Sequence, residues 1–435
     1  MVSWLLHTSL LSNIERSDGL GGCKRRPVPP AVKLFFMKWL DAYSEGQQPK
    51  STKEMAKALG VSDKACSSAF RMLISNGYVE RVAEGTGGVG RPKYIYRPAR
   101  KTMIAVDGYA NKCSLYWGEQ IKDFFRDIGG DPPGLCVFYM TLLAHADKAG
   151  FVSGVGCRRL CHLVGVTRQS LGVYEKALIK RKLIRSIVPA FAGGGLVKKL
   201  DKVYLLDFEW SFKRRGSGRA VEIRYPMFGA EWINHAQQLI EGLCGGSKFI
   251  LHTPSLSRAM LNFSVDDGLV FSGLPDNERV RLIEALQPRL LVYACWMIRY
   301  HPELIGMHDD KIKKCQDLES KIHRELLGNY TGAMAESASM IVGAIRVSAN
   351  MIARLVLLPL RLARFPGKER TIYQEITVNS GCVQIVNDRN EADEIVIRAL
   401  MPGVSYDLDN EYRVYDEMNG AYLFVRSLSD DGCNK

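Results

Sequence analysis

Hydrophobic and polar positions recur with helical spacing over residues 52–79, the most clearly patterned stretch of the chain. The pattern predicts a short helix over residues 52–59, a break at residues 60–62 and a longer helix ending near Gly77. Ser62 suits the cap of the longer helix, and Gly77 suits the left-handed turn that ends it. One face of this helix gathers apolar side chains, and the opposite face gathers polar ones: Cys66, Ala69, Phe70 and Leu73 against Lys64, Ser67, Ser68 and Arg71.

A β-hairpin is expected directly after this helix. Residues 78–83 and 91–96 alternate like strands, and a glycine-rich tip at residues 85–90 joins them beside Arg91 and Lys93. An apolar helix over residues 31–43 precedes the pair of helices. Three helices followed by a hairpin resemble the winged helix-turn-helix family. The resemblance implies that the third helix enters the DNA major groove and that the hairpin, or wing, touches the phosphate backbone.

The same pattern returns further along the chain. An apolar helix is expected over residues 135–146, a short helix over 157–163, a Gly-Val-Thr break, a long helix over 168–182 and a second wing. Thr167 follows Ser62 by 105 residues, and the two long helices align without gaps. The second long helix again divides its faces, with Leu171, Tyr174, Ala177 and Leu178 opposite Arg168, Gln169, Gly172 and Lys176. The second wing carries Lys198, Lys199 and Lys202. This internal duplication is the strongest signal in the sequence.

The second copy resembles the winged units of phage and plasmid replication proteins, and equally those of bacterial repressors. In both, the resemblance implies binding to double-stranded DNA. From the residue types at the outward positions and in the wings, the expected DNA contacts are Lys64, Ser67, Ser68, Arg71, Arg91, Lys93, Arg168, Gln169, Lys176, Lys198 and Lys199.

The net charge of +13 is concentrated in these two blocks. Residues 24–101 hold 16 Lys and Arg against 6 Asp and Glu, and residues 157–220 hold 15 against 4. A basic run at residues 213–219 fits either a phosphate contact or a solvated linker. Basic charge gathered in pattern-matched segments favours a polyanionic partner.

The remaining pattern is weaker. Helices are expected near residues 230–243, over 277–300 with an interruption at Pro288, and over 333–362 with a kink or break at Pro359. In the last of these, Arg346, Arg354 and Arg361 would form a basic stripe on an apolar rod, which suits a bundle or homo-oligomer interface better than a membrane-surface helix. The acidic tail alternates like strands around a helix near residues 390–400, with a hairpin turn at residues 418–421.

The sequence gives little support for a nucleotide-binding, zinc-binding or catalytic site. The glycine-rich segment 87–93 lacks the spacing of a P-loop, and Cys157, Cys161 and His162 lack the further close ligand pair of a zinc site. No nucleophile or paired carboxylate has a catalytic setting, so the protein is expected not to be an enzyme and to need no metal or cofactor. Scattered cysteines, no secretory signal and no membrane span predict a cytoplasmic protein.

We therefore expect a mainly α fold with small β wings (α+β). The segments are a flexible leader (1–26), two winged helix-turn-helix domains (27–101 and 131–208), a connector with one helix near 115–125 (102–130), a basic linker and mixed region (209–275), a helical region suited to oligomerisation (276–366) and a small acidic α+β domain (367–435). The expected function is sequence-specific DNA binding as a transcriptional regulator. The alternatives are an initiator or accessory protein of plasmid or phage replication that binds iterated repeats, and a scaffold whose winged units bind protein.

Overall fold

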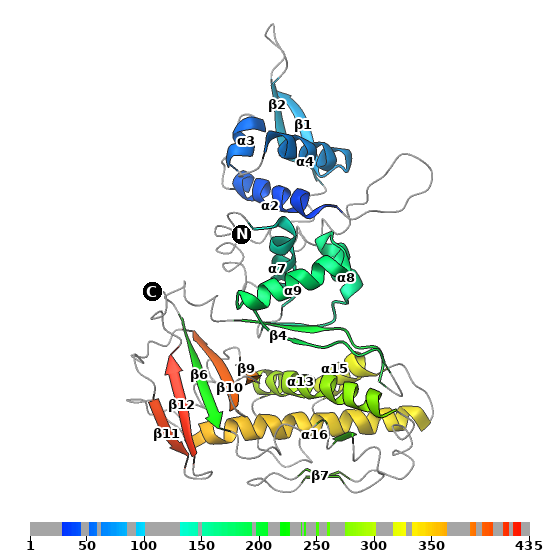
Figure 1. Ribbon diagram of the computed structural model, residues 1–435, viewed down its shortest axis with the longest axis vertical. Helices are drawn as coiled ribbons and strands as arrows, with labels where there is room; N and C mark the ends of the chain where they lie inside the picture. The colour runs from blue at the N-terminus through cyan, green and yellow to red at the C-terminus, as the bar shows by residue number, and fades with distance from the viewer. Residues whose placement is uncertain are drawn as a thin grey trace. The chain divides into compact units, whose positions relative to one another are not determined.

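The structure is a computed structural model of the chain. It describes residues 28–44, 52–58, 62–84, 93–100, 131–146, 150–193, 197–207, 218–226, 236, 239–240, 249–251, 259–261, 275–301, 316–327, 333–362, 383–388, 394–402, 412–416 and 421–427. These form two compact units, residues 1–186 and 187–435, and the boundary falls inside one strand. The fold is mainly helical with antiparallel sheets (Figure 1).

The first half of the first unit contains three helices and a hairpin: α2 (Pro30–Ser44), α3 (Thr52–Ala58), α4 (Asp63–Ser75), β1 (Val79–Glu84) and β2 (Lys93–Pro98). The strands pair antiparallel, with Val79 opposite Pro98 and Glu84 opposite Lys93. Aromatic rings fill the space between α2, α4 and the hairpin, since Phe70 meets Phe35 edge to face and lies parallel to Tyr96 at 4.1 Å between ring centroids. We call residues 28–100 the first repeat.

The second half follows the same order: α7 (Pro133–His145), β3 (Phe151–Val152), α8 (Cys157–Val164), α9 (Arg168–Lys180) and β4 (Ile184–Val188). We call residues 131–188 the second repeat. Helix α7 is apolar on all sides and buried over residues 134–143, and α8 and α9 both pack against it. Helix burial on every side explains why its sequence shows no amphipathic stripe.

The two repeats share a hydrogen-bond frame at a fixed offset of 105 residues. The caps Ser62 and Thr167 each accept a bond of 3.2 Å from the backbone N–H three residues later. After α4, the N–H groups of residues 76, 77 and 78 donate to the carbonyls of 72, 74 and 73, and after α9 residues 181, 182 and 183 donate to 177, 179 and 178. The turn takes a positive φ in both, 66° at Gly77 and 57° at Lys182. The cap and turn geometry around α4 therefore recurs around α9 at the expected offset.

A buried lysine joins the two repeats within the first unit. Lys33 on α2 is 0% exposed, and its ammonium donates to the carbonyl oxygens of His162 (3.3 Å) and Leu163 (2.5 Å) in the last turn of α8. Beside it, the carbonyl of Val28 lies so close to Gly165 that a Cβ there would clash. Gly165 also ends α8 with a φ of 84°, so glycine is required for two reasons. We call this contact region the seam.

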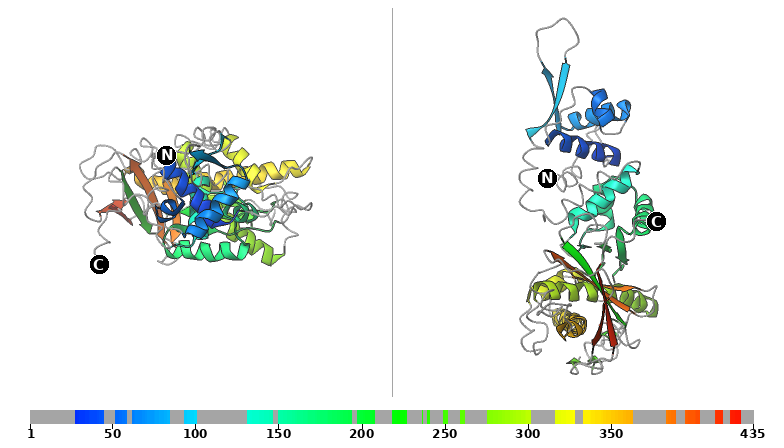
Figure 2. Two further views of the ribbon diagram at one scale, coloured as in Figure 1. Left: turned by 90° about the horizontal axis from the view of Figure 1, so that it is seen from above. Right: turned by 90° about the vertical axis from the view of Figure 1, so that its left-hand side faces the viewer.

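The second unit contains a helical layer and a twisted sheet (Figure 2). The long helix α16 (Ala333–Leu362) packs against α13 (Asp276–Tyr300) and α15 (Gln316–Leu326). The five-stranded antiparallel sheet has the order β11-β12-β6-β10-β9 (Tyr412–Asp416, Ala421–Ser427, Gly218–Pro226, Glu394–Pro402 and Val383–Asp388), and β9 contacts α13. Strand β5 (Val203–Leu206) and the two-stranded pair β7 (Phe249–Leu251) and β8 (Ala259–Leu261) complete the described elements.

Several expectations for this unit need correction. Residues 394–402 form β10 and not a helix, because this segment is hydrogen-bonded as a strand on both sides, to β6 and to β9. Pro288 lies inside α13, and α16 continues through Pro359, so neither proline ends its helix.

The basic run is also placed differently. Its last residues, from Gly218 onward, belong to β6, which pairs with β10 and β12, so this part of the expected linker is a central strand of the tail's sheet. Helix α15 was not expected. Strands β11 and β12 pair as an antiparallel hairpin whose last described pair is Asp416 with Ala421, so four residues separate the strands. The two central residues of the turn expected at residues 418–421 lie outside the described part of the chain.

Arg346 does not belong to a solvent-facing stripe. It is 7% exposed and pairs with Glu319 of α15 at 3.2 Å, so α16 turns this cation inward within its own chain. The side chains of Arg354 and Arg361 lie outside the described residues, as do the leader, the helix expected at 115–125, residues 213–217 and the wing tip with Arg91. Residues 236, 239 and 240 are helical within the helix expected near 230–243. In the described part of the chain, no helix is long and apolar enough to cross a membrane.

Candidate nucleic-acid interface

Helix α4 divides its faces as its spacing predicts. Cys66, Ala69, Phe70 and Leu73 are buried. The four polar residues singled out from sequence, Lys64, Ser67, Ser68 and Arg71, are all exposed. The carboxylate of Asp63 also lies at the exposed first turn, where it complements the helix dipole. The outward face of α4 is therefore short, polar and cationic toward its centre.

Helix α9 exposes the corresponding positions. Arg168, Gln169 and Lys176 are exposed, and a Cβ built on Gly172 would meet no atom within 4 Å. With the 105-residue offset, Gln169 stands for Lys64, Gly172 for Ser67 and Lys176 for Arg71. Unlike α4, α9 has no acidic residue in its first turn. Its N-terminal end is therefore the more favourable of the two for a negatively charged group.

Two features of α9 were missed from sequence. Val173, at the position of Ser68, is 60% exposed and adds an apolar group to the outward face. Glu175, at the position of Phe70, is 8% exposed although it is a carboxylate. The 105-residue alignment could have located both, because it assigns position 173 to the outward face and position 175 to the buried one.

The first hairpin carries a cation over an aromatic ring. The Arg81 guanidinium lies 3.4 Å from the centroid of the Tyr94 ring, and both side chains are exposed. Tyr96 instead packs on Phe70 and is half-buried, so Tyr94 is the more exposed of the two tyrosines. Lys93 begins β2, and its side chain lies outside the described residues. Arg81 was not among the expected contacts, because its partner could not be read from spacing alone.

The second hairpin belongs to the second unit from residue 187 onward, and it is anchored there. Phe191 and Leu200 exchange two backbone hydrogen bonds as an antiparallel bridge. Lys198 and Lys199 are both exposed, but the Lys198 ammonium donates to the carbonyl of Arg324 at the end of α15. The Lys198 ammonium thus uses one of its three donors within its own chain, and the phosphate contacts expected of Lys198 and Lys199 stay predictions.

Burial shifts the pKa of a lysine and of several cysteines in the first unit. It lowers the pKa of Lys33 to about 7 and raises the pKa of Cys66 to about 11 and of Cys136 to about 12. The pKa of Cys161 is raised to about 11, by burial first and by Cys157 second, so without a bound metal ion this thiol is protonated near neutral pH. Among the described residues, no group of three or more His, Cys, Asp or Glu side chains could hold a metal ion.

Comparisons of the chain with protein-family models, curated proteins and solved structures yield no match. Both faces lie on the third helix of a three-helix and hairpin arrangement, and both are capped and ended in the same way.

Proposed function

We propose that this chain binds double-stranded DNA in a sequence-specific manner through two winged helix-turn-helix units. In this proposal α4 and α9 are the recognition helices, and the hairpins after them are wings. The repeated element order and the repeated cap, turn and hydrogen-bond frame support it. So does the basic balance of both segments.

One observation carries the proposal. At equivalent positions 105 residues apart, α4 and α9 each bury one face and expose polar or cationic side chains at two positions of the other, Lys64 and Arg71 on α4 and Gln169 and Lys176 on α9. A helix that served only to fill the core would have no reason to repeat both the burial and the outward polar positions.

The chemistry of the exposed side chains suggests how bases would be distinguished. Arg168 can donate two hydrogen bonds to guanine, and Gln169 can pair with adenine in the major groove. Val173 can contact a thymine methyl group, and Gly172 would let the backbone come close to the bases. Lys199 and Arg81 lie on hairpins, from which cations would contact phosphates and give affinity without sequence preference.

We infer a regulatory role as the leading assignment. Two reading units in one chain also suit iterated origin repeats, so a replication initiator or accessory protein is the second candidate. Footprinting on the genetic neighbourhood separates the two, since a regulator would protect a promoter and an initiator would protect repeated origin sequence.

A salt titration tests DNA binding itself. If several cations contact phosphates, affinity for duplex DNA should fall by orders of magnitude between about 50 and 200 mM salt. Absence of DNA binding at both salt concentrations, together with binding of a protein partner that persists at the higher one, would contradict the proposal and favour a protein scaffold.

A further inference from the structure

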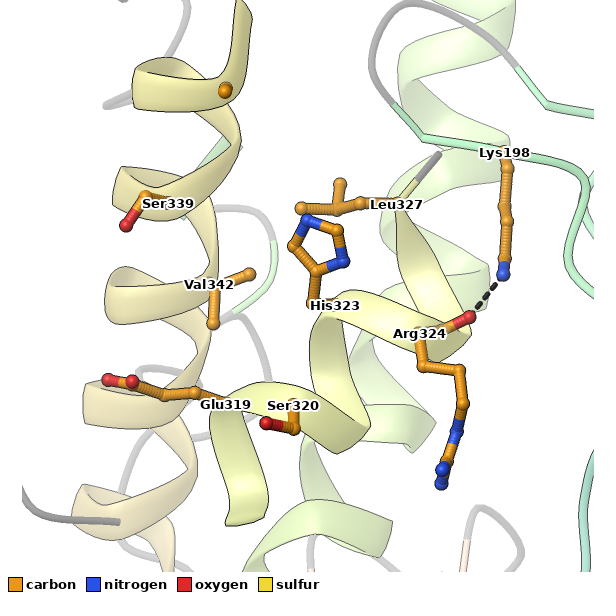
Figure 3. A pocket seen from close by; sticks show the side chains of 9 residues that line it. Lys198, Glu319, Ser320, His323, Arg324, Leu327, Ser339 and Val342 are labelled. Atoms are coloured by element: carbon orange, nitrogen blue, oxygen red, sulfur yellow. Dashed lines mark hydrogen bonds between the residues drawn. The ribbon is translucent and has the colours of Figure 1, made fainter. Parts of the chain in front are cut away.

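A polar cavity of about 570 Å³ lies between α15 and α16 in the second unit (Figure 3). Residues from three segments line it: Lys198 of the second hairpin, then Glu319, Ser320, His323, Arg324 and Leu327 of α15 and its end, and Ala335, Ser339 and Val342 of α16. Its volume lies within the range of sites that take small molecules. It is distinct from the outward faces of α4 and α9, which belong to the first unit.

The charges around this cavity favour an anion. Lys198 and Arg324 are the two cations among the lining residues, and His323 extends its ring into the space between α15 and α16. In Figure 3 the Lys198 ammonium points toward the Arg324 carbonyl, and the Arg324 side chain extends away from α16 along the edge of the cavity. The single carboxylate in the lining, Glu319, is offset by its pair with Arg346 at 3.2 Å. Within the described segments no carboxylate forms an ion pair with Lys198 or Arg324, so a negatively charged ligand would meet positive charge at this edge of the cavity, with the imidazole N–H as a further hydrogen-bond donor.

The rest of the lining favours an organic ligand of modest size. The hydroxyl groups of Ser320 and Ser339 can donate to an anionic oxygen. Leu327 and Val342 are buried and offer an apolar wall. An anionic head and a short apolar body match these two kinds of surface.

The second hairpin is hydrogen-bonded directly to the end of α15, which lines the cavity. The Lys198 N–H donates to the Leu326 carbonyl at 2.9 Å, Val197 and Leu327 form an antiparallel bridge, and the Lys198 ammonium bonds the Arg324 carbonyl. Further along the hairpin, the buried Arg289 donates to the carbonyls of Pro189 and Asp201. A ligand that engaged Lys198 would therefore change the bonds that hold this hairpin on α15.

We propose that this cavity is an effector site for a small organic anion bearing a carboxylate or phosphate group, and that occupancy alters the attachment of the second hairpin to α15. The consequence for DNA binding rests on the function proposed above. The site and its effect on the hairpin do not, because both can be measured without DNA.

Isothermal calorimetry on the full chain tests the site, with inorganic phosphate and citrate as separate probes. We expect at least one probe to bind with a Kd of about 1 mM or tighter, and Arg324→Gln to raise that Kd about tenfold or more. Arg168→Gln is the matched control, because it removes the same charge from the proposed DNA-reading face and should leave the Kd unchanged. No binding of either probe at about 20 mM would overturn the proposal, as would equal loss in both variants.

Hydrogen exchange then tests the connection to the hairpin. Saturating probe should change the exchange rate of residues 197–200 in the wild type, and the change should be lost in Arg324→Gln. Binding that leaves this segment unaltered would overturn the proposed effect on the hairpin. Because neither measurement involves DNA, a failure here is distinct from a failure to bind duplex.

Discussion

Replacing Lys33 by methionine should remove a defined part of the pH dependence of stability. Lys33 is 0% exposed at the seam, and its pKa falls from the ordinary value of 10.5 to about 7 in the folded chain. Between these two values the unfolded chain binds the proton and the folded chain does not, so stability rises with pH across this window. Lys33→Met keeps a similar apolar length and abolishes the titration.

The size of the effect follows from the two pKa values. A group that titrates near 7 when folded and near 10.5 when unfolded raises the free energy of unfolding by about 2 kcal/mol between pH 7 and pH 9. The buried thiols act in the opposite direction, because the pKa values of Cys66 and Cys136 are raised on folding. The informative quantity is therefore the wild-type change minus the Lys33→Met change, in which the thiols cancel.

Pulse proteolysis in urea at pH 7 and pH 9 provides the measurement, with peptides from α2 and α7 quantified by mass spectrometry so that the first unit is followed separately. Lys57→Met, at an exposed position on α3, is the matched control and should retain the wild-type pH response. Identical pH responses in wild type and Lys33→Met would refute the argument, since Lys33 would then be solvated or paired with a charge in the folded chain.

Three further predictions follow from the outward faces and the turns. Arg168→Ala should reduce discrimination between specific and random duplexes by about 1–3 kcal/mol in competition binding, and equal loss on both duplexes would contradict a base contact. Lys199→Ala should weaken all duplexes about equally and lower the slope of affinity against salt by about 1, whereas a sequence-dependent loss would argue against a phosphate contact. Gly172→Ala should stabilise α9 by about 0.5–1 kcal/mol in urea unfolding yet weaken specific binding, while Gly165→Ala should destabilise the chain by at least about 1–2 kcal/mol because its φ is 84° and Val28 blocks the Cβ. Destabilisation by both alanines, or by neither, would refute the distinction between these glycines.

The first unit was largely predictable because its signals are local. Ser62, Thr167 and Gly77 act within one helical turn of their own positions, and the 105-residue offset required only an alignment of the chain with itself. The exposure of Lys64 and Arg71 followed from helix periodicity once the buried face was known.

Contacts between residues far apart in the sequence could not be predicted from such local signals. Nothing near Lys33 in sequence indicates that α8, about 130 residues away, supplies carbonyl acceptors for its ammonium. Lys198 looked like a free wing cation because its acceptor at Arg324 is 126 residues away. For Arg346, helical spacing gave the position correctly, but the burial and the pairing with Glu319 depend on α15.

The prediction of a helix in the C-terminal tail was wrong for a related reason. Residues 394–402 have an ambiguous local pattern, and their strand state is settled by partners on both sides, β6 and β9. One of these partners, β6, comes from a segment expected to be a linker. A local period cannot decide between helix and strand when the deciding hydrogen bonds come from so far away.

The position of β6 has a consequence for synthesis of the chain. Both of its neighbours, β10 and β12, are translated more than 160 residues after it, so for several seconds at typical elongation rates a growing chain carries β6 with neither edge paired. The helix caps and turns in the repeats of the first unit are made by residues close in sequence. These elements can therefore form during translation, before the rest of the chain is made. Unpaired strand edges invite wrong partners. The vulnerable interval for aggregation therefore lies between the emergence of residue 226 and the emergence of residue 402, when a holding chaperone would be of most use.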